Sequence, residues 1–349
     1  MENSTSHILV IRLSAMGDCA LAIPVLLRLI NSYPKIKITV ITKKFFVPIF
    51  KTLPAQQVEV IGVDTKKEYK GFFGILKLGR TLKKMNFQKI ADLHNVLRSK
   101  ILRTQFSFSG IKSAKIDKGR KEKKALTRAE NKIFKPLKTT PQRYVEVFNK
   151  LGYFIDLEEN ITLEKPNLTE NIKNIIGKNA QKLIGIAPFA AHKAKTYPLA
   201  LMQEIIADLN AKNNFKILLF GGGKKEIKAL EKISSAYENV ISIAGKITFE
   251  EEIKLISHLD LMLAMDSGNG HLAAMYDISV ITIWGATHPF AGFSPFKQKQ
   301  ENQFIPDLKK FPLLPTSVFG NKEVEGYEEV MKSISPEKIT NRILEILES

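Results

Sequence analysis

The stretch HILVIRLSAMGD, residues 7–18, decides the fold. Its first part, His7 to Leu13, is almost entirely apolar, which is typical of a buried strand. A turn follows in which Gly17 permits a tight change of direction, and a helical pattern then continues to about residue 31. A buried strand that leads through a glycine turn into a helix predicts the first βα unit of a parallel sheet.

The same alternation of strands and helices continues along the chain. The first half has further β-branched or apolar runs at 36–41, 58–61 and 89–93. The second half has runs at 182–187, 215–220, 240–243, 260–263 and 279–284, and a last helix at about 336–347. This order predicts an α/β fold with two Rossmann-like doubly wound domains facing across a cleft. In such sheets the ligand lies beyond the carboxyl ends of the strands.

The boundary between the two domains is expected in the acidic, polar stretch 154–178, which contains Pro166 and no strong strand. We therefore expect an N-terminal domain over residues 1–165 and a C-terminal domain over 166–335. Residues 336–349 form a separate C-terminal helix in this scheme.

The composition excludes several classes of protein. Hydrophobic residues make up 44% of the 349 residues and charged residues 25%, a balance that argues against a disordered chain. One cysteine, Cys19, leaves no internal disulfide framework and no cysteine-based zinc or iron–sulfur site. The longest clean apolar run, Cys19 to Leu27, is far shorter than the ~20 residues of a spanning helix. With no signal-peptide pattern at the start, the expected location is cytoplasmic.

The positive charge is concentrated in the first half. Residues 1–150 hold 31 Lys and Arg against 10 Asp and Glu, whereas residues 151–349 hold 22 against 25. The stretch 98–143 alone holds 15 basic and 3 acidic residues. Such asymmetry is typical of a protein with a polyanionic partner, which here means nucleic acid, an anionic bilayer or a phosphorylated substrate. A solvated basic loop without a partner is the alternative.

Two charged residues stand where a reaction would be expected. Asp18 lies in a first helical turn after a strand, where it is either a helix-start residue or a general base that takes a proton from a sugar hydroxyl. Lys195 lies in a loop between a strand and a helix, where it is either a surface lysine or a phosphate ligand.

Two glycine-rich turns follow strands of the second half. Gly221-Gly222-Gly223-Lys224-Lys225-Glu226 lacks Walker A spacing, but Glu226 stands where a carboxylate accepts hydrogen bonds from ribose hydroxyls. Asp266-Ser267-Gly268-Asn269-Gly270-His271 exposes several backbone N–H groups at a helix start. This arrangement favours a diphosphate, although a capped helix with a packed histidine is the alternative.

Four stretches together resemble glycosyltransferase family 9, the heptosyltransferases of lipopolysaccharide core assembly. Residues 8–18 resemble the opening strand with its Gly-Asp motif, and residues 91–99, ADLHNVLRS, resemble an Asp-x-Gln…Ser segment. Lys195-Thr-Tyr197-Pro198 resembles Lys-x-Trp-Pro. Residues 266–274 with 284–287 resemble the Asp-Ser/Thr-Gly-x-x-His-x-Ala-Ala and Phe-Gly-x-Thr pair. The four stretches follow one another in family order.

The resemblance implies a GT-B fold and an inverting, metal-independent transfer of heptose from ADP-heptose to an inner-core acceptor, with no cofactor. It implies an N-terminal domain for the acceptor and a C-terminal domain for the nucleotide sugar. The implied catalytic residues are Asp18, as the general base, and Lys195, which stabilises the leaving diphosphate. The implied donor-binding residues are Glu226, Asp266, Ser267, Gly268, His271 and Thr287. The implied acceptor-binding residues are Ser14, Gly17, His94, Arg98 and Arg120.

The implied partners are the nucleotide sugar, an anionic lipid-linked saccharide, and the inner face of the cytoplasmic membrane through the basic N-terminal domain. The enzyme is expected to be a monomer and to bind no nucleic acid. Three departures from the family pattern leave the acceptor and the donor sugar open, namely Tyr197 for tryptophan, His94 for glutamine and the pair Asn269-Gly270. The alternatives are a GT-B enzyme with another nucleotide sugar, or a non-catalytic relative that binds lipopolysaccharide or nucleic acid.

Overall fold

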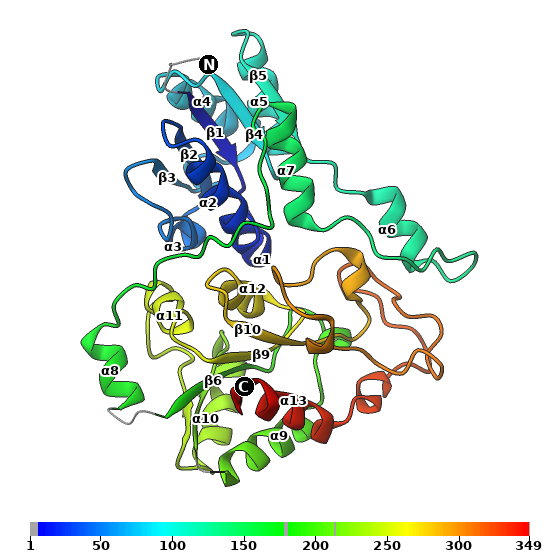
Figure 1. Cartoon of the computed structure of the whole chain (residues 1–349). Helices are drawn as coiled ribbons and strands as arrows, with labels where there is room; N and C mark the ends of the chain where they lie inside the picture. The colour runs from blue at the N-terminus through cyan, green and yellow to red at the C-terminus, as the bar shows by residue number, and fades with distance from the viewer. Residues whose placement is uncertain (1–5, 178–180, 213, 349) are drawn as a thin grey trace. The chain divides into compact units, whose positions relative to one another are not determined.

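The computed structural model describes residues 6–177, 181–212 and 214–348, and the chain divides into two compact units (Figure 1). The first unit comprises Met1–Lys118 and Thr140–Leu163, and the second comprises Gly119–Thr139 and Glu164–Ser349. Each unit holds one parallel sheet in an α/β arrangement, so the predicted fold class is confirmed.

The sheet of the first unit has the strand order β3-β2-β1-β4-β5, and every neighbouring pair is parallel. The predicted strands are confirmed, and a short fifth strand, with only Ala114 buried, lies at the edge. The strands are β1 (His7–Ile11), β2 (Lys37–Lys43), β3 (Val58–Val63), β4 (Lys89–Asp92) and β5 (Lys112–Lys115). The helices of this unit are α1 (Met16–Ala20), α2 (Ile23–Ser32), α3 (Val47–Phe50), α4 (Gly71–Lys83), α5 (Leu97–Ser107) and α7 (Thr140–Lys150).

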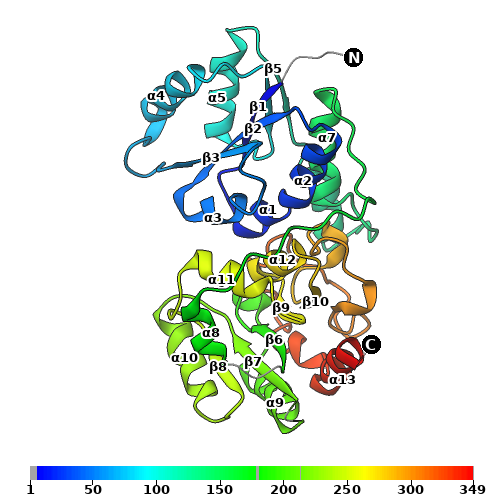
Figure 2. The ribbon, with the colours of Figure 1, turned by 60° about the vertical axis from the view of Figure 1, so that its left-hand side comes forward.

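Helices cover both faces of this sheet, as Figure 2 shows for α4 and α5 on one side and α2 and α7 on the other. Leu9 and Ile11 of β1 pack in one buried cluster with Leu78 of α4 and Phe106 of α5. Because both faces are covered, β1 is an almost continuous apolar run, and polar residues gather at its carboxyl end.

The sheet of the second unit has the order β11-β10-β9-β6-β7-β8, again with parallel pairs. Its strands are β6 (Lys182–Ala187), β7 (Phe215–Leu219), β8 (Val240–Ser242), β9 (Leu261–Met265), β10 (Ser279–Ile283) and β11 (Gln303–Phe304). Its α-helices are α6 (Arg120–Thr127), α8 (Glu170–Ile176), α9 (Leu199–Ala211), α10 (Lys224–Ser234), α11 (Phe249–Ile256), α12 (Gly268–Ala274) and α13 (Pro336–Glu348). The C-terminal helix α13 packs beside α9 on this sheet.

The segment 119–139 belongs to the second unit, whereas the sequence predicts it within an N-terminal domain of residues 1–165. Its Lys132 ammonium donates hydrogen bonds to the carbonyl oxygens of Leu313, Leu314 and Pro315, the latter two at 2.9 and 3.3 Å. Leu126 and Leu137 of the segment pack with Ala291 in a small buried cluster. These few apolar residues are spaced too widely in a basic stretch for periodicity to reveal which unit they pack against.

No helix in the described ranges is long and apolar enough to cross a membrane.

Candidate active site

The first cluster of site residues lies at the carboxyl end of β1, around Asp18. The Asp18 carboxylate forms an ion pair with Arg12, and its Oδ2 also accepts a hydrogen bond from the backbone N–H of Ala15 at 3.3 Å. The Asp18 side chain is 28% exposed, and its Oδ1 accepts no hydrogen bond within the described part of the chain. One carboxylate oxygen is therefore held in place while the other remains open to a ligand.

Arg12 and Tyr144 fix the position of Asp18. The Arg12 guanidinium, nearly buried at the end of β1, donates to the Leu93 carbonyl at 2.6 Å and lies 5.9 Å from the centre of the Tyr144 ring. The Tyr144 hydroxyl donates to the Asp18 carbonyl oxygen at 3.1 Å. Neither residue is in the predicted site. An arginine inside an apolar strand is a signal for Arg12, whereas Tyr144 of α7 has no local signal.

Three of the predicted acceptor residues lie near this turn. Ser14 and Gly17 are part of it, and His94 follows β4, the strand next to β1. The backbone N–H of Leu13 donates to Nδ1 of His94 at 3.3 Å. Burial, with the nearby charges of Arg12 and Lys118, lowers the pKa of His94 to about 3. His94 is therefore neutral at pH 7 and carries its proton on Nε2, as a hydrogen-bond donor.

The remaining acceptor residues lie on other elements. Arg98 is exposed on the first turn of α5, and Arg120 begins α6 in the second unit. Asp92, which belongs to the motif around His94, is buried and binds the backbone N–H groups of His94 and Asn95. Asp92 also pairs with Arg103 at 2.8 Å, so its role is to shape the loop.

The second cluster lies at the carboxyl ends of β6 and β9, neighbouring strands of the second sheet. The Lys195 ammonium bonds the Asp266 carbonyl oxygen at 2.6 Å and Oδ2 at 3.0 Å, and their side chains are only 12% and 11% exposed. Gly320 lies against the Lys195 stem, where a Cβ atom would stand 2.2 Å from Cγ of Lys195. The sequence prediction named both charged residues, and the structure adds that they form a pair.

Two hydroxyl groups near this pair are buried without a hydrogen-bond partner in the part of the chain that the structure describes. They are Oγ of Ser267, which precedes the first turn of α12, and Oγ1 of Thr287, which follows β10. The loop that carries Thr287 is joined to the Lys195 loop because the Ala286 N–H donates to the Ala194 carbonyl at 2.8 Å. Since buried hydroxyl groups are normally hydrogen-bonded, these two favour a polar ligand.

The other predicted donor residues lie at the same edge of the sheet. Gly268 and the buried His271 are in α12, directly after Ser267. Glu226 is in the first turn of α10, after β7, and its Oε2 accepts a hydrogen bond from the Gly222 N–H at 2.8 Å. Glu226 therefore closes its own glycine loop, and no described contact joins it to Lys195 or Asp266.

Glu252 of α11 lies next to the predicted donor turn and was not named in the sequence prediction. The Asn269 side-chain amide donates to Oε1 of Glu252 at 3.1 Å, which links α11 to the first turn of α12. Burial raises the pKa of Glu252 to about 7, and the hydrogen bond from Asn269 opposes the rise. Glu252 is one of three glutamates in the first turn of α11, and nothing in the sequence distinguishes it as the one in this environment.

We expect the second unit to lose stability between about pH 5 and pH 8 because of Glu252. Its folded pKa of about 7 exceeds its ordinary value of 4.5, so the folded state keeps a proton that the unfolded state releases. The resulting stabilisation is complete at low pH and is lost as the pH rises to the folded pKa. Urea unfolding at both pH values should show a loss of about 2 kcal/mol that is absent from Glu252→Gln. An equal loss in the variant would assign the effect to other groups.

Comparisons with known proteins identify the family of the chain. The model of the family described as glycosyltransferase family 9 (heptosyltransferase) matches residues 75–313. Lipopolysaccharide heptosyltransferase 1 of Campylobacter coli is 25% identical, with 97% of this chain and 98% of the relative covered. A lipopolysaccharide core heptosyltransferase of Haemophilus influenzae is 27% identical, with 80% of this chain and 79% of the relative covered.

The fold of the chain is also similar to that of several solved structures. A glycosyl transferase family 9 structure from Veillonella parvula has a TM-score of 0.75 at 18% identity and covers 100% of this chain and 99% of its own. E. coli heptosyltransferase WaaC with ADP has a TM-score of 0.68 at 17% identity and covers 97% and 99%. These likenesses confirm the predicted GT-B class of fold. Since the family model spans more than half of the chain, the protein belongs to glycosyltransferase family 9 and is a glycosyltransferase.

Proposed function

We propose that the protein transfers heptose from ADP-heptose to an anionic, lipid-linked saccharide of the lipopolysaccharide inner core. The observation that carries the proposal is the nearly buried Lys195–Asp266 pair beside the hydroxyls of Ser267 and Thr287, which have no hydrogen-bond partner among the described residues. A cation and two hydroxyl donors suit the oxygens of a nucleoside diphosphate. The names of the relatives support heptose as the sugar, and a solved relative is described with ADP.

In the proposed reaction Asp18 takes the proton from an acceptor hydroxyl. The acceptor oxygen then attacks the anomeric carbon of the sugar, and the bond between that carbon and the diphosphate oxygen breaks. A single displacement of this kind inverts the anomeric configuration. The open Oδ1 of Asp18 suits the base, because Arg12 and Ala15 already hold Oδ2.

Lys195 serves the other end of the breaking bond. The leaving diphosphate gains negative charge as the bond breaks, and an ammonium group at that position stabilises the transition state more than the ground state. The proposed transfer needs no metal ion, because Lys195 supplies this positive charge. It also uses no cofactor, and we propose that the enzyme acts as a monomer.

Calorimetric titration with ADP-heptose, ADP, UDP and GDP tests the donor assignment. We expect the adenine ligands to bind more tightly than UDP or GDP, and the Lys195→Ala variant to lose this binding. Tighter binding of UDP or GDP would keep a glycosyltransferase but replace the donor. An absence of nucleotide binding would favour a non-catalytic relative that binds lipopolysaccharide or nucleic acid.

We further propose that the enzyme works in the cytoplasm, as a peripheral protein on the inner face of the cytoplasmic membrane. A group of exposed phenylalanines and lysines, which we call the aromatic–lysine surface, supports this location. Its residues come after the ends of β2 and β3, which are neighbouring strands. Three phenylalanines there are largely exposed, Phe45 at 57%, Phe72 at 56% and Phe73 at 83%. Four exposed lysines, Lys44, Lys66, Lys67 and Lys70, lie next to these phenylalanines or a few residues before them in the sequence. Exposed aromatic rings among lysines suit the headgroup region of an anionic bilayer.

Vesicle co-sedimentation tests this surface. The protein should bind phosphatidylglycerol vesicles and leave pure phosphatidylcholine vesicles largely unbound. Replacing Phe72 and Phe73 by serine should weaken binding roughly tenfold or more, because each buried Phe contributes about 1.5–3 kcal/mol. Phe154→Ser is the control, since Phe154 is 71% exposed in the same unit but outside the surface. Unchanged binding of the double variant would rule this surface out as the membrane contact.

A further inference from the structure

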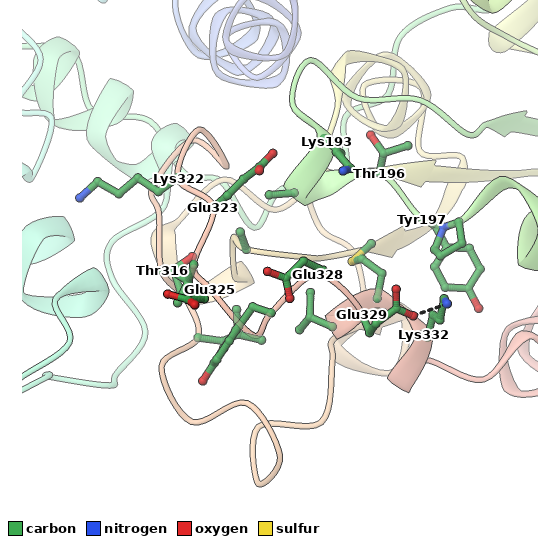
Figure 3. A pocket seen from close by; sticks show the side chains of 18 of the residues that line it. Lys193, Thr196, Tyr197, Thr316, Lys322, Glu323, Glu325, Glu328, Glu329 and Lys332 are labelled. Atoms are coloured by element: carbon green, nitrogen blue, oxygen red, sulfur yellow. Dashed lines mark ion pairs between the residues drawn. The ribbon is translucent and has the colours of Figure 1, made fainter.

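The second unit contains a cavity beside the Lys195 loop. Its volume is about 510 Å³, and it is lined by Lys193, Ala194 and residues 196–199, by Ala286 and by residues of the segment 314–332 (Figure 3). None of the predicted donor residues lines it in the described part of the chain. A volume of this size is typical of sites for small organic ligands.

The floor of the cavity is apolar and rigid. Tyr197, Leu314 and Met331 line it and are each at least 95% buried, with exposures of 1%, 3% and 4%. The Tyr197 hydroxyl donates to the Ile334 carbonyl at 2.6 Å, so the tyrosine offers its ring to the cavity and keeps its polar atom occupied. This floor suits an aliphatic or aromatic body of a ligand.

The polar groups of the wall favour a cation. Thr316 is 8% exposed, lines the cavity, and its hydroxyl makes no hydrogen bond to a described residue. Four glutamates and three lysines line the cavity. The dashed line in Figure 3 marks the ion pair of Glu329 with Lys332, and the Lys322 side chain extends away from the other labelled residues. Among the lining residues, the remaining glutamates, Glu323, Glu325 and Glu328, thus outnumber the remaining lysine, Lys193.

We propose that this cavity is a second ligand site, which binds an organic cation with an apolar body, such as a primary amine, and is coupled to the nucleotide site. The apolar floor takes the body of the ligand. The ammonium group is held by the carboxylates of Glu325 and Glu328 and by the hydroxyl oxygen of Thr316, which has an unused acceptor position.

Lys195 provides the coupling. Ala194 and Thr196, on either side of Lys195, both line the cavity, while the Lys195 ammonium bonds Asp266. Gly320 lies against the Lys195 stem, in the stretch of chain between Thr316 and Lys322, two residues that line the cavity. A ligand that moves either wall therefore changes the position of Lys195. This coupling, unlike the binding site itself, rests on the proposed donor role of Lys195.

A pair of matched probes tests the site in the full-length protein. Phenylbutylamine and its neutral counterpart phenylbutanol have the same apolar body and differ in the cation. We expect calorimetry to show roughly three- to tenfold tighter binding of the amine, the scale expected for partly exposed charge pairs. Glu328→Gln should remove most of this preference and leave the fold intact, because Glu328 is exposed and glutamine retains an acceptor for the Gly326 N–H.

Two variants separate the cavity from general charge effects. Thr316→Val should weaken amine binding, whereas Glu301→Gln, at an exposed position outside the cavity, should leave it unchanged. Equal binding of amine and alcohol, or a full amine preference in Glu328→Gln, would overturn the site. These results are independent of nucleotide binding, so they stand even where the donor assignment fails.

The coupling is measured by titrating ADP with and without saturating amine. We expect the apparent Kd of ADP to change by about fivefold or more, and the same factor to appear in the amine affinity when ADP is present. An unchanged ADP affinity in the presence of bound amine would overturn the coupling.

Discussion

Replacement of Asp18 by asparagine is expected to lower kcat by about a hundredfold to ten-thousandfold, the range that a general base contributes. Asparagine has nearly the same shape and keeps an oxygen that accepts hydrogen bonds from Arg12 and from the Ala15 N–H. It cannot accept the proton of the acceptor hydroxyl. The KM for ADP-heptose should change little, because the proposed role of Asp18 is toward the acceptor hydroxyl, whereas the proposed donor residues belong to the second unit.

The choice of asparagine matters because Arg12 is only 5% exposed. An alanine at position 18 would leave this buried guanidinium with neither a counter-charge nor a hydrogen-bond acceptor, a change that typically destabilises by about 3–5 kcal/mol and makes unfolding hard to distinguish from loss of the base. Asparagine loses the charge but keeps the acceptor. Asp208→Asn is the matched control, since Asp208 is exposed on α9. Thermal unfolding of each variant should accompany the kinetics. A folded Asp18→Asn enzyme within tenfold of the parent kcat would assign the base to another residue.

The alternation of strands and helices could be predicted because each buried strand is an apolar run bounded by a turn. The edge strand β5 could not, because Lys112-Ser-Ala-Lys115 buries only Ala114 and gives no hydrophobic pattern. The position of segment 119–139 also escaped prediction. Lys132 attaches this segment to the second unit, because its ammonium donates hydrogen bonds to three carbonyl groups nearly two hundred residues later in the chain.

Prediction of the site from the sequence was limited in the same way. Asp18, Lys195 and Asp266 were predicted because each follows a strand in a motif, and motifs are local. The residues that hold them come from elsewhere: Tyr144 from α7 supports the Asp18 backbone, and Gly320 confines the Lys195 stem. The pairing of Lys195 with Asp266 depends on β6 and β9 being neighbours, which the strand order determines and the sequence pattern alone does not. Glu252 becomes notable only through its burial and its bond from Asn269.

Removal of the Lys195 ammonium is expected to lower kcat by about a hundredfold to a thousandfold, comparable to the loss of one preorganised donor in a site of developing charge. The affinity for ADP should also fall, since the diphosphate loses its cation. Lys212→Ala, at an exposed position after α9, is the control for the loss of a lysine as such. An unchanged ADP affinity together with an unchanged kcat in Lys195→Ala would contradict the donor site.

The ion pair with Asp266 means that the loss of Lys195 affects stability as well as catalysis, and a second variant can separate the two effects. Lys195 and Asp266 are 12% and 11% exposed, so the single variant leaves a nearly buried carboxylate without its partner and loses stability for that reason alone. The double variant Lys195→Met, Asp266→Asn removes both charges. If the lysine only stabilises the fold, the double variant should regain stability and activity together. If it stabilises the leaving diphosphate, as we propose, the double variant should regain stability while kcat stays low, because methionine offers the diphosphate no positive charge.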